Sequence, residues 1–199
     1  LISVSFNPSC IKNRISNIKG RMVFDSRGKP TVEAEITVNG EISGSSIAPS
    51  GASTGKKEAI EKRDNKNDFL GESVNNNILL INTIIKENLV GFDIEDQEGI
   101  DNKLIILDDT PNKSFLGANT TIAVSMAALK TAAISNKTSL WSYLSLNSEK
   151  KIPLPEVQII GGGAHAKGSI PIQDFMIIPN GAPNFYIALE WIFKVYRKA

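Results

Sequence analysis

The sequence predicts an α+β fold, in which an antiparallel meander of strands precedes a group of helices and a second unit then begins. Residues 31–38 alternate between apolar and polar side chains and run directly into Asn39-Gly40. Further along, apolar residues recur at helical spacing, and strand patterns return after a short polar stretch at 147–151. Strands followed by helices are typical of an α+β domain, so we expect one such domain to end near residue 147.

The predicted meander is built around residues 31–38. Asn-Gly is the strongest short signal for a hairpin turn, so residues 41–47 are expected to return as the next strand. Residues 21–24 are expected to add another strand through the turn-rich segment 25–30. The apolar side chains of 31–38 stand two apart and should share one buried face; they are Val32, Ala34, Ile36 and Val38.

Helices are predicted over the next stretch of the chain. Residues 72–89 carry an apolar stripe at i, i+4 and i+7 spacing, and residues 119–135 are rich in alanine and apolar nearly all round. The first pattern predicts an amphipathic helix and the second a buried one. We also expect a short charged helix at 56–63, a helix at 94–106 and a further turn at 141–146.

A second unit is expected from residue 148. Residues 152–160 and 170–178 read as two apolar strands separated by a glycine-rich loop, and Pro179-Asn180-Gly181 leads into a terminal helix. At the other end of the chain, residues 1–14 show no clean period. The expected organisation is therefore a loose tail at 1–14, an α+β domain at 15–147 and the start of a second domain at 148–199.

Composition excludes several classes of function. The 199 residues include 22 Lys and Arg against 21 Asp and Glu, a net charge of +1. Nucleic-acid binders need an excess of basic residues, which this chain lacks. No apolar run reaches the ~18–20 residues of a membrane span, and no signal-peptide core is visible. A single cysteine, Cys10, excludes an internal disulfide. We expect a cytoplasmic protein.

Two glycine-rich segments can carry chemistry. Residues 50–56 lie between a predicted strand and a predicted helix, where backbone N–H groups and hydroxyls can meet a phosphate or a hard cation. Their spacing does not fit a Walker A loop, and a plain connector is equally compatible with the composition. Residues 161–166 formally fit the dinucleotide pattern G-x-G-x-x-A, but a strand follows where that motif requires a helix, so we reject it.

Three side chains near this second segment are candidates. His165 is the only histidine and follows a predicted strand, where it could serve proton or phosphate chemistry or a purely structural role. Gln173 and Asp174 interrupt an apolar strand. A buried carboxylate is costly unless it is paired, so Asp174 either has a partner or faces solvent at a strand end.

Several blocks of the sequence resemble the enolase family, and they occur in the family's order. Residues 25–33 (DSRGKPTVE) are similar to the signature near the start of enolases. Residues 49–55 (PSGASTG), followed by Glu58-Ala59 and Arg63-Asp64, resemble the mobile catalytic loop and the helix after it.

The later blocks extend the resemblance to about residues 15–199. Residues 115–119 (FLGAN) are similar to the segment before the family's long alanine-rich helix. Residues 162–166 (GGAHA) and 172–177 (IQDFMI) resemble the first two strand ends of the enolase barrel. The resemblance implies an N-terminal α+β domain that caps a β/α (TIM-like) barrel, of which residues 148–199 would be the start.

The resemblance also implies an activity and its cofactor. Enolases are lyases of glycolysis that reversibly dehydrate 2-phosphoglycerate to phosphoenolpyruvate, with two Mg²⁺ ions stabilising the enolate formed when a lysine takes a proton. The family commonly dimerises through its N-terminal region, so a homodimer is implied. By position, Ser53 matches the serine that ligates the second Mg²⁺, and Ala52 lies on the same substrate-closing loop. His165 matches the histidine near the phosphate and leaving group, and Gln173 and Asp174 match the pair that lines the substrate pocket.

The sequence departs from the family pattern at three places. Lys29 and Gly161 each stand where asparagine is usual, and Asp174 is one methylene shorter than the usual glutamate. The family's lysine base, its proton-donating glutamate and its three metal-binding carboxylates lie on later barrel strands. We therefore expect an N-terminal portion of an enolase that is inactive alone. There are two alternatives: a non-catalytic interaction and dimerisation module, and a lyase of the same superfamily that acts on another acid. The loop at 50–55 favours enolase itself over the second alternative.

Overall fold

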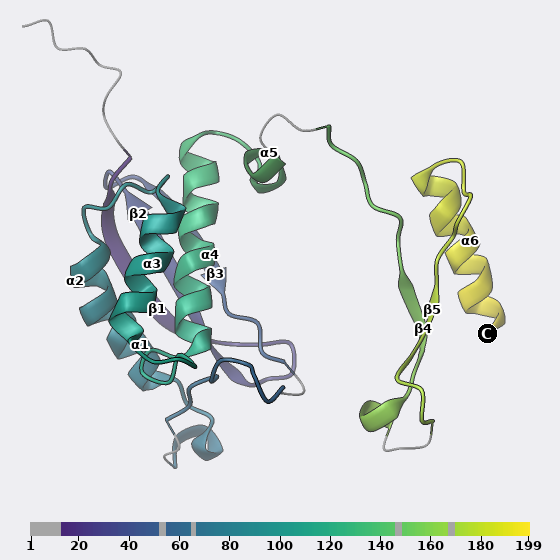
Figure 1. The fold of residues 1–199 in the computed structure, drawn as a ribbon, viewed down its shortest axis with the longest axis horizontal. Helices are drawn as coiled ribbons and strands as arrows, with labels where there is room; N and C mark the ends of the chain where they lie inside the picture. Colours follow the sequence, from purple (N-terminus) through teal and green to yellow (C-terminus); the bar gives the residue numbers. More distant parts are fainter. Residues whose placement is uncertain (1–12, 52–54, 65–66, 146–148, 167–169) are drawn as a thin grey trace, which may run out of the picture. The chain divides into compact units, whose positions relative to one another are not determined.

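The computed structural model describes residues 13–51, 55–64, 67–145, 149–166 and 170–199 (Figure 1). The chain divides into two compact units, Leu1–Leu146 and Asn147–Ala199, and each is described here by itself. Most of the expected tail at 1–14 lies outside the described residues. Of the part that is described, Arg14 forms a bridge with Asp93 next to the first strand.

A three-stranded antiparallel sheet forms the first layer of unit 1. Its strands are β1 (Ile15–Phe24), β2 (Pro30–Val38) and β3 (Ile42–Ile47), in the order β1-β2-β3. This confirms the predicted meander. All four alternating apolar residues of β2 are fully buried. Asn39 and Gly40 both take left-handed backbone angles, with φ of 52° and 81°, as the two central residues of a type I′ turn require, and Glu41 N–H closes the turn onto the Val38 carbonyl at 3.1 Å.

Strand β1 begins six residues before the predicted start at 21. Its pairing with β2 slips between Ile15 and Asn17, so the buried residues Ile15 and Ile18 lie three apart instead of two. A bulge of this kind breaks the period of two by which a strand is recognised.

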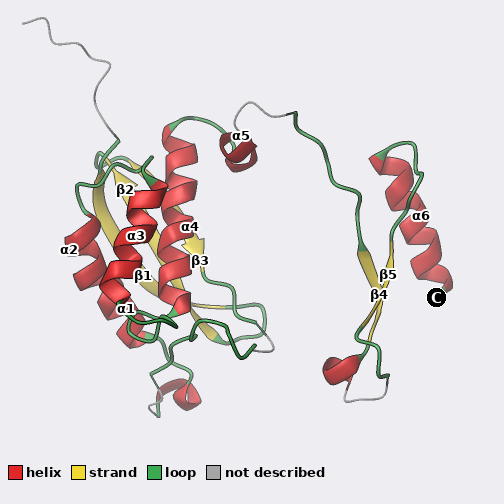
Figure 2. Cartoon of the chain, in the orientation of Figure 1, coloured by secondary structure: helices red, strands yellow, loops and turns green. Residues whose placement is uncertain are grey.

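The helices form the second layer, on one face of the sheet (Figure 2). Helix α1 (Asn75–Leu80), the π-helical turn η3 (Ile81–Ile85) and helix α2 (Lys86–Leu89) are consecutive and account for the predicted helix at 72–89. Helices α3 (Gln97–Asp108), α4 (Ala118–Ser135) and α5 (Leu140–Ser145) match the helices expected at 94–106, 119–135 and 141–146. Helix α4 packs on β2 and β3, and η3 packs beside β1.

The core of unit 1 lies between these two layers. It contains the buried face of β2 together with Ile81, Ile85 and Leu89 of the long helical segment, Leu104 of α3 and the alanine-rich side of α4. Helix α4 lies close to the sheet at Gly44 of β3. A Cβ atom at this glycine would lie 2.6 Å from Thr131 Oγ1 and 3.0 Å from the Thr131 backbone nitrogen.

The predicted charged helix at 56–63 is wrong. Residues 55–64 form a turn and an extended segment, whose backbone groups bond to distant parts of the chain. Ile60 N–H donates to the Asn112 carbonyl at 2.8 Å, and the Ile60 carbonyl accepts from Ala118 N–H at 2.8 Å. These bonds take the groups that a helix would pair internally, so tertiary contacts override local propensity. A short 3₁₀ turn, η2 (Asp68–Gly71), follows.

Unit 2 contains a hairpin and a helix. Strands β4 (Val157–Gly161) and β5 (Asp174–Ile177) pair antiparallel around the 3₁₀ turn η4 (Gly163–Ala166), and helix α6 (Phe185–Lys198) follows. Strand β4 is shorter than the predicted 152–160. Pro153 and Pro155 lack backbone N–H groups and hold the first part of that range outside the ladder. Within the described residues these strands close no barrel. No helix in the described ranges is long and apolar enough to cross a membrane.

Candidate functional site

The turn between β1 and β2 is organised by Asp25. Its Oδ1 accepts hydrogen bonds from Lys29 N–H at 2.9 Å and Arg27 N–H at 2.8 Å, and its Oδ2 forms an ion pair with Arg27 Nε at 3.5 Å. The Lys29 bond, with help from Arg27, lowers the pKa of Asp25 below its usual value. Lys29 Nζ in turn pairs with Glu72 Oε1 at 2.6 Å. The turn is therefore fixed both internally and to the segment before α1.

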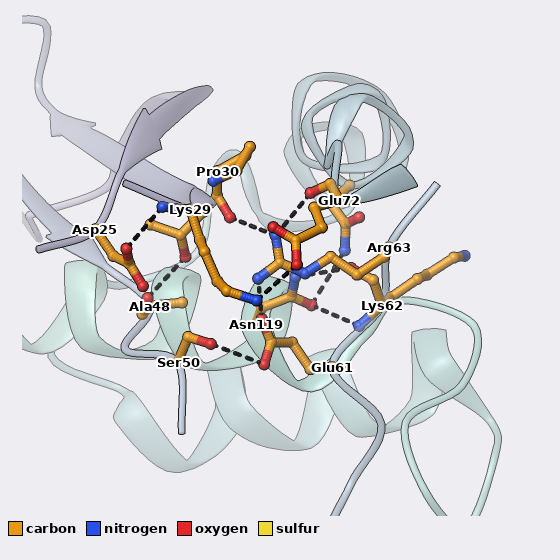
Figure 3. Close-up of polar contacts among 12 residues, drawn as sticks. Asp25, Lys29, Pro30, Ala48, Ser50, Glu61, Lys62, Arg63, Glu72 and Asn119 are labelled. Atoms are coloured by element: carbon orange, nitrogen blue, oxygen red, sulfur yellow. Dashed lines mark hydrogen bonds and ion pairs between the residues drawn. The ribbon is translucent and has the colours of Figure 1, made fainter. Parts of the chain in front are cut away.

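Arg63 joins three parts of unit 1. Its guanidinium donates to the Pro30 carbonyl at the start of β2 and to the Glu72 carbonyl at 2.7 Å, and it forms an ion pair with Glu61 (Figure 3). The side chain is only 16% exposed. Because a guanidinium presents its donors in a fixed plane, these acceptors are held in a set arrangement.

Ser50 is bound from two sides. Its hydroxyl donates to Glu61 Oε2 at 3.1 Å, and its carbonyl accepts from the Arg27 guanidinium. The sequence blocks at 25–33 and 49–55 thus meet in space, close to the segment at 61–63. We call these residues the anchoring network; its members are Asp25, Arg27, Lys29, Ser50, Glu61, Arg63 and Glu72.

Asn119 secures the other side of the same region. Its side chain accepts from Lys62 N–H at 3.2 Å and donates to the Lys62 carbonyl at 3.0 Å. Asn77, fully buried in α1, donates to Asn119 Oδ1 at 3.2 Å and to Thr120 Oγ1 at 2.8 Å. Lys62 also donates to the Phe115 carbonyl and lies 5.5 Å from the centre of the Phe115 ring. The start of α4 is therefore joined to the segment that carries Glu61.

A surface pocket of about 280 Å³ lies beside this network. Its wall comes from three parts of the chain: the residues before 52–54, the segment at 58–61 and the start of α4. The lining residues are Pro49, Gly51, Glu58, Ala59, Glu61, Ala118, Asn119 and Ile122. Ala52 and Ser53, the loop residues predicted to meet substrate and metal, lie outside the described residues.

The other predicted site residues lie together in unit 2. Asp174 begins β5, is half-buried and accepts a hydrogen bond from Gln158 on β4. Gln173 has an exposed side chain, and its carbonyl accepts from Gly162 N–H at 2.6 Å. His165 lies in η4, directly after β4. The hairpin thus brings the segment around His165 to the end of β5 where Gln173 and Asp174 lie.

Sequence reasoning missed Glu61 and Glu72. Glu61 contacts Ser50, 11 residues away, and Glu72 contacts Lys29, 43 residues away. A local sequence pattern does not show pairings between residues this far apart.

A divalent metal needs several oxygen ligands from carboxylates or similar groups. The residues that the structure describes hold no group of three or more His, Cys, Asp or Glu side chains that could bind a metal ion. In the anchoring network, Glu61 and Glu72 are each paired with a cation. The described side chains therefore do not fit a metal cage.

Comparison with known proteins decides the family. The model of the enolase N-terminal domain matches residues 15–144. The chain belongs to the enolase family. The model of the enolase C-terminal TIM barrel domain matches residues 149–199, so the hairpin and α6 correspond to the start of the enolase barrel.

Curated enolases are similar over most of the chain. "Enolase 1" of Desulfitobacterium hafniense (strain Y51) is 47% identical over 186 residues, which cover 94% of this chain and 43% of that protein. "Enolase" of Tropheryma whipplei (strain Twist) is 45% identical over 184 residues, covering 92% of this chain and 43% of that protein. The chain thus spans less than half the length of these enolases.

Asp108 at the end of α3 gives a prediction about pH. Burial opposes its ionisation, but hydrogen bonds from the Thr110 hydroxyl, Leu116 N–H (2.7 Å) and Thr110 N–H (3.1 Å) outweigh it and lower the pKa of the carboxyl. A carboxyl whose pKa is lower in the folded than in the unfolded protein stabilises the fold at pH values above its unfolded pKa of about 3.9. This stabilisation is lost as the pH falls through the folded pKa. We expect Asp108→Asn to cost about 1–3 kcal/mol at pH 7, because the N–H of buried Leu116 loses its carboxylate partner.

Chemical denaturation at several pH values measures this effect. The difference between wild type and Asp108→Asn should shrink below about pH 4 as the wild-type carboxylate is protonated. Asp109→Asn is the matched control, because Asp109 is exposed and asparagine tolerates its left-handed backbone. A constant difference from pH 7 to pH 2 would contradict the role given to the carboxylate.

Proposed function

We propose that this chain supplies the N-terminal domain and the first barrel strands of a Mg²⁺-dependent lyase that reversibly dehydrates 2-phosphoglycerate to phosphoenolpyruvate. Membership of the enolase family and 45–47% identity to proteins named enolase support the reaction class. A cytoplasmic homodimer without nucleic-acid partners is part of the same proposal, in keeping with the near-neutral charge of the chain.

The residue roles follow the family positions. Ser53 would ligate Mg²⁺ through its hydroxyl, and Ala52 would contact substrate on the same loop. His165 would lie against the phosphate and leaving-group side, while Gln173 and Asp174 would line the substrate pocket. Bound Mg²⁺ supplies Lewis-acid stabilisation of negative charge that develops on the substrate. Because the described side chains form no metal cage, the carboxylate ligands are proposed to come from the part of the enolase fold that this chain does not span.

One structural observation carries the proposal. The anchoring network fixes Ser50, two residues before Ala52, by hydrogen bonds to side chains from both the β1–β2 turn and the segment at 61–63. A flexible connector needs no such contacts, whereas a loop that must present a ligand or substrate contact at a defined place does. These contacts support the proposal that the loop's entry is part of a site.

The test joins this chain to the part of the Desulfitobacterium hafniense enolase that follows its matched region. With 2-phosphoglycerate, we expect the joined protein to give a Mg²⁺-dependent rise in the ultraviolet absorbance of phosphoenolpyruvate, and the 199-residue chain alone to give none. Ser53→Ala in the joined protein should abolish most of this rise, and Ser43→Ala, at an exposed position of β3, should preserve it. A folded joined protein without turnover would contradict the proposed reaction, and turnover by the chain alone would contradict its inactivity.

A further inference from the structure

Ser50 is held through both its backbone and its side chain. Its carbonyl accepts from Arg27, 23 residues earlier, and its hydroxyl donates to Glu61, 11 residues later. Two independent contacts fix both the position and the orientation of a residue more tightly than one contact does. The chain therefore reaches the segment 52–54 from a defined starting point.

The two oxygens of the Glu61 carboxylate bind different residues. Oε1 accepts from Arg63 and forms the ion pair, and Oε2 accepts from Ser50 at 3.1 Å. The side chain is 29% exposed, so water competes only in part for these bonds. A hydrogen bond to an ionised carboxylate is stronger than one to a neutral amide oxygen. The charge on Glu61 thus strengthens the contact to Ser50.

Arg63 connects the Glu61–Ser50 contact to the rest of the fold. The same guanidinium that binds Glu61 also donates to the carbonyls of Pro30 and Glu72. Pro30 begins β2, whose next residues Thr31 and Val32 are buried in the core. A continuous path of hydrogen bonds therefore runs from the sheet through Arg63 and Glu61 to Ser50.

We propose that Glu61 is a positioning residue of this enzyme: held by Arg63, its carboxylate fixes Ser50 and so sets where the chain enters the segment that carries Ala52 and Ser53. The effect on turnover rests on the proposed function. The effect on Ser50 itself does not, because it follows from the contacts of the 199-residue chain alone.

Backbone ¹⁵N relaxation in the 199-residue chain tests the contact directly. In wild type the order parameters of Ser50 and Gly51 should be close to the value of rigid backbone, about 0.85, and in Glu61→Gln and in Ser50→Ala they should fall toward about 0.6. Order parameters in β2 should stay unchanged. Ser50→Thr keeps a hydroxyl and should keep the wild-type value. Glu58→Gln, on the same segment, is the matched control and should behave as wild type.

Turnover of the joined protein gives the second measurement. Glu61→Gln should lower kcat by about 10–100-fold with a smaller change in KM, since misplacement of a catalytic loop by about 1 Å costs on this order. Unchanged order parameters at Ser50 and Gly51 in both variants, or an equal fall in Glu58→Gln, would overturn the proposal. A fall in the order parameters with unchanged kcat would overturn the positioning role. If the order parameters fall as expected while the wild-type joined protein lacks turnover, the contact is supported and the proposed lyase function fails.

Discussion

Replacing Gly44 with alanine is expected to lower the free energy of unfolding by about 1–3 kcal/mol, the usual cost of forcing an extra carbon into a packed interface. The new Cβ would lie 2.6 Å from Thr131 Oγ1 and 3.0–3.1 Å from the Thr131 backbone N and Cα atoms. The hydroxyl could rotate away, but the backbone of α4 cannot move without disturbing the packing of the alanines on either side. Helix and strand would therefore have to separate.

Urea denaturation followed by far-ultraviolet circular dichroism measures this loss. Ser45→Ala, the next residue on β3, removes an oxygen and adds no atom, so it is a matched control that should stay within about 0.5 kcal/mol of wild type. Thr131→Ala combined with Gly44→Ala should recover part of the loss, because it removes the nearest atom. A Gly44→Ala protein as stable as wild type would show that the β3–α4 contact is looser than described.

Replacing Asn119 with alanine is expected to cost about 2–3 kcal/mol, because it leaves the N–H and carbonyl of Lys62 and a buried amide donor of Asn77 with fewer partners. Asn119 is 3% exposed and Asn77 is fully buried, so water cannot easily replace the missing side chain. Beyond the loss of stability, the segment that carries Glu61 and Arg63 should become locally more open.

Two measurements separate these effects. Thermal unfolding reports the global loss, and amide exchange at residues 60–63 reports the local one. Asn88→Ala provides the control, because the Asn88 side chain donates only to the Ile84 carbonyl of its own helical segment, at 2.9 Å, among the described contacts. It should cost less than about 1 kcal/mol. An equal loss of stability in Asn119→Ala and Asn88→Ala would contradict the role given to the Asn119 contacts.

The parts of the fold that were predictable from the sequence are those determined by neighbouring residues. Asn39 and Gly40 specify their own turn, and the alternation of β2 follows from a sheet with one buried face. The segment at 56–63 was mispredicted because its backbone bonds to Asn112 and Ala118, more than 50 residues away. A charged segment has no apolar period that could reveal those partners.

In the candidate site, too, some residues could be predicted from the sequence and others depend on distant contacts. The motif residues Arg27, Ser50 and Arg63 stand out because they belong to blocks that resemble a family. Glu61 does not stand out, since its role depends on which side chains the fold brings to its two oxygens. For Asp174, the sequence left open a buried partner or a solvent-facing strand end. The structure shows a half-buried carboxylate paired with Gln158 across the hairpin.

The geometry of the β2–β3 hairpin has a consequence for the order of folding. Its two strands are separated by only three residues, so they can meet on the microsecond timescale of hairpin formation. The contacts of Lys29 with Glu72 and of Lys62 with Asn119 close loops of 43 and 57 residues, which is entropically slower. We therefore expect the β2–β3 hairpin to be in place before Lys29 is joined to Glu72 and Lys62 to Asn119. During that interval the chain would have the hairpin, but not yet the contacts of Asn119 that hold the segment carrying Glu61.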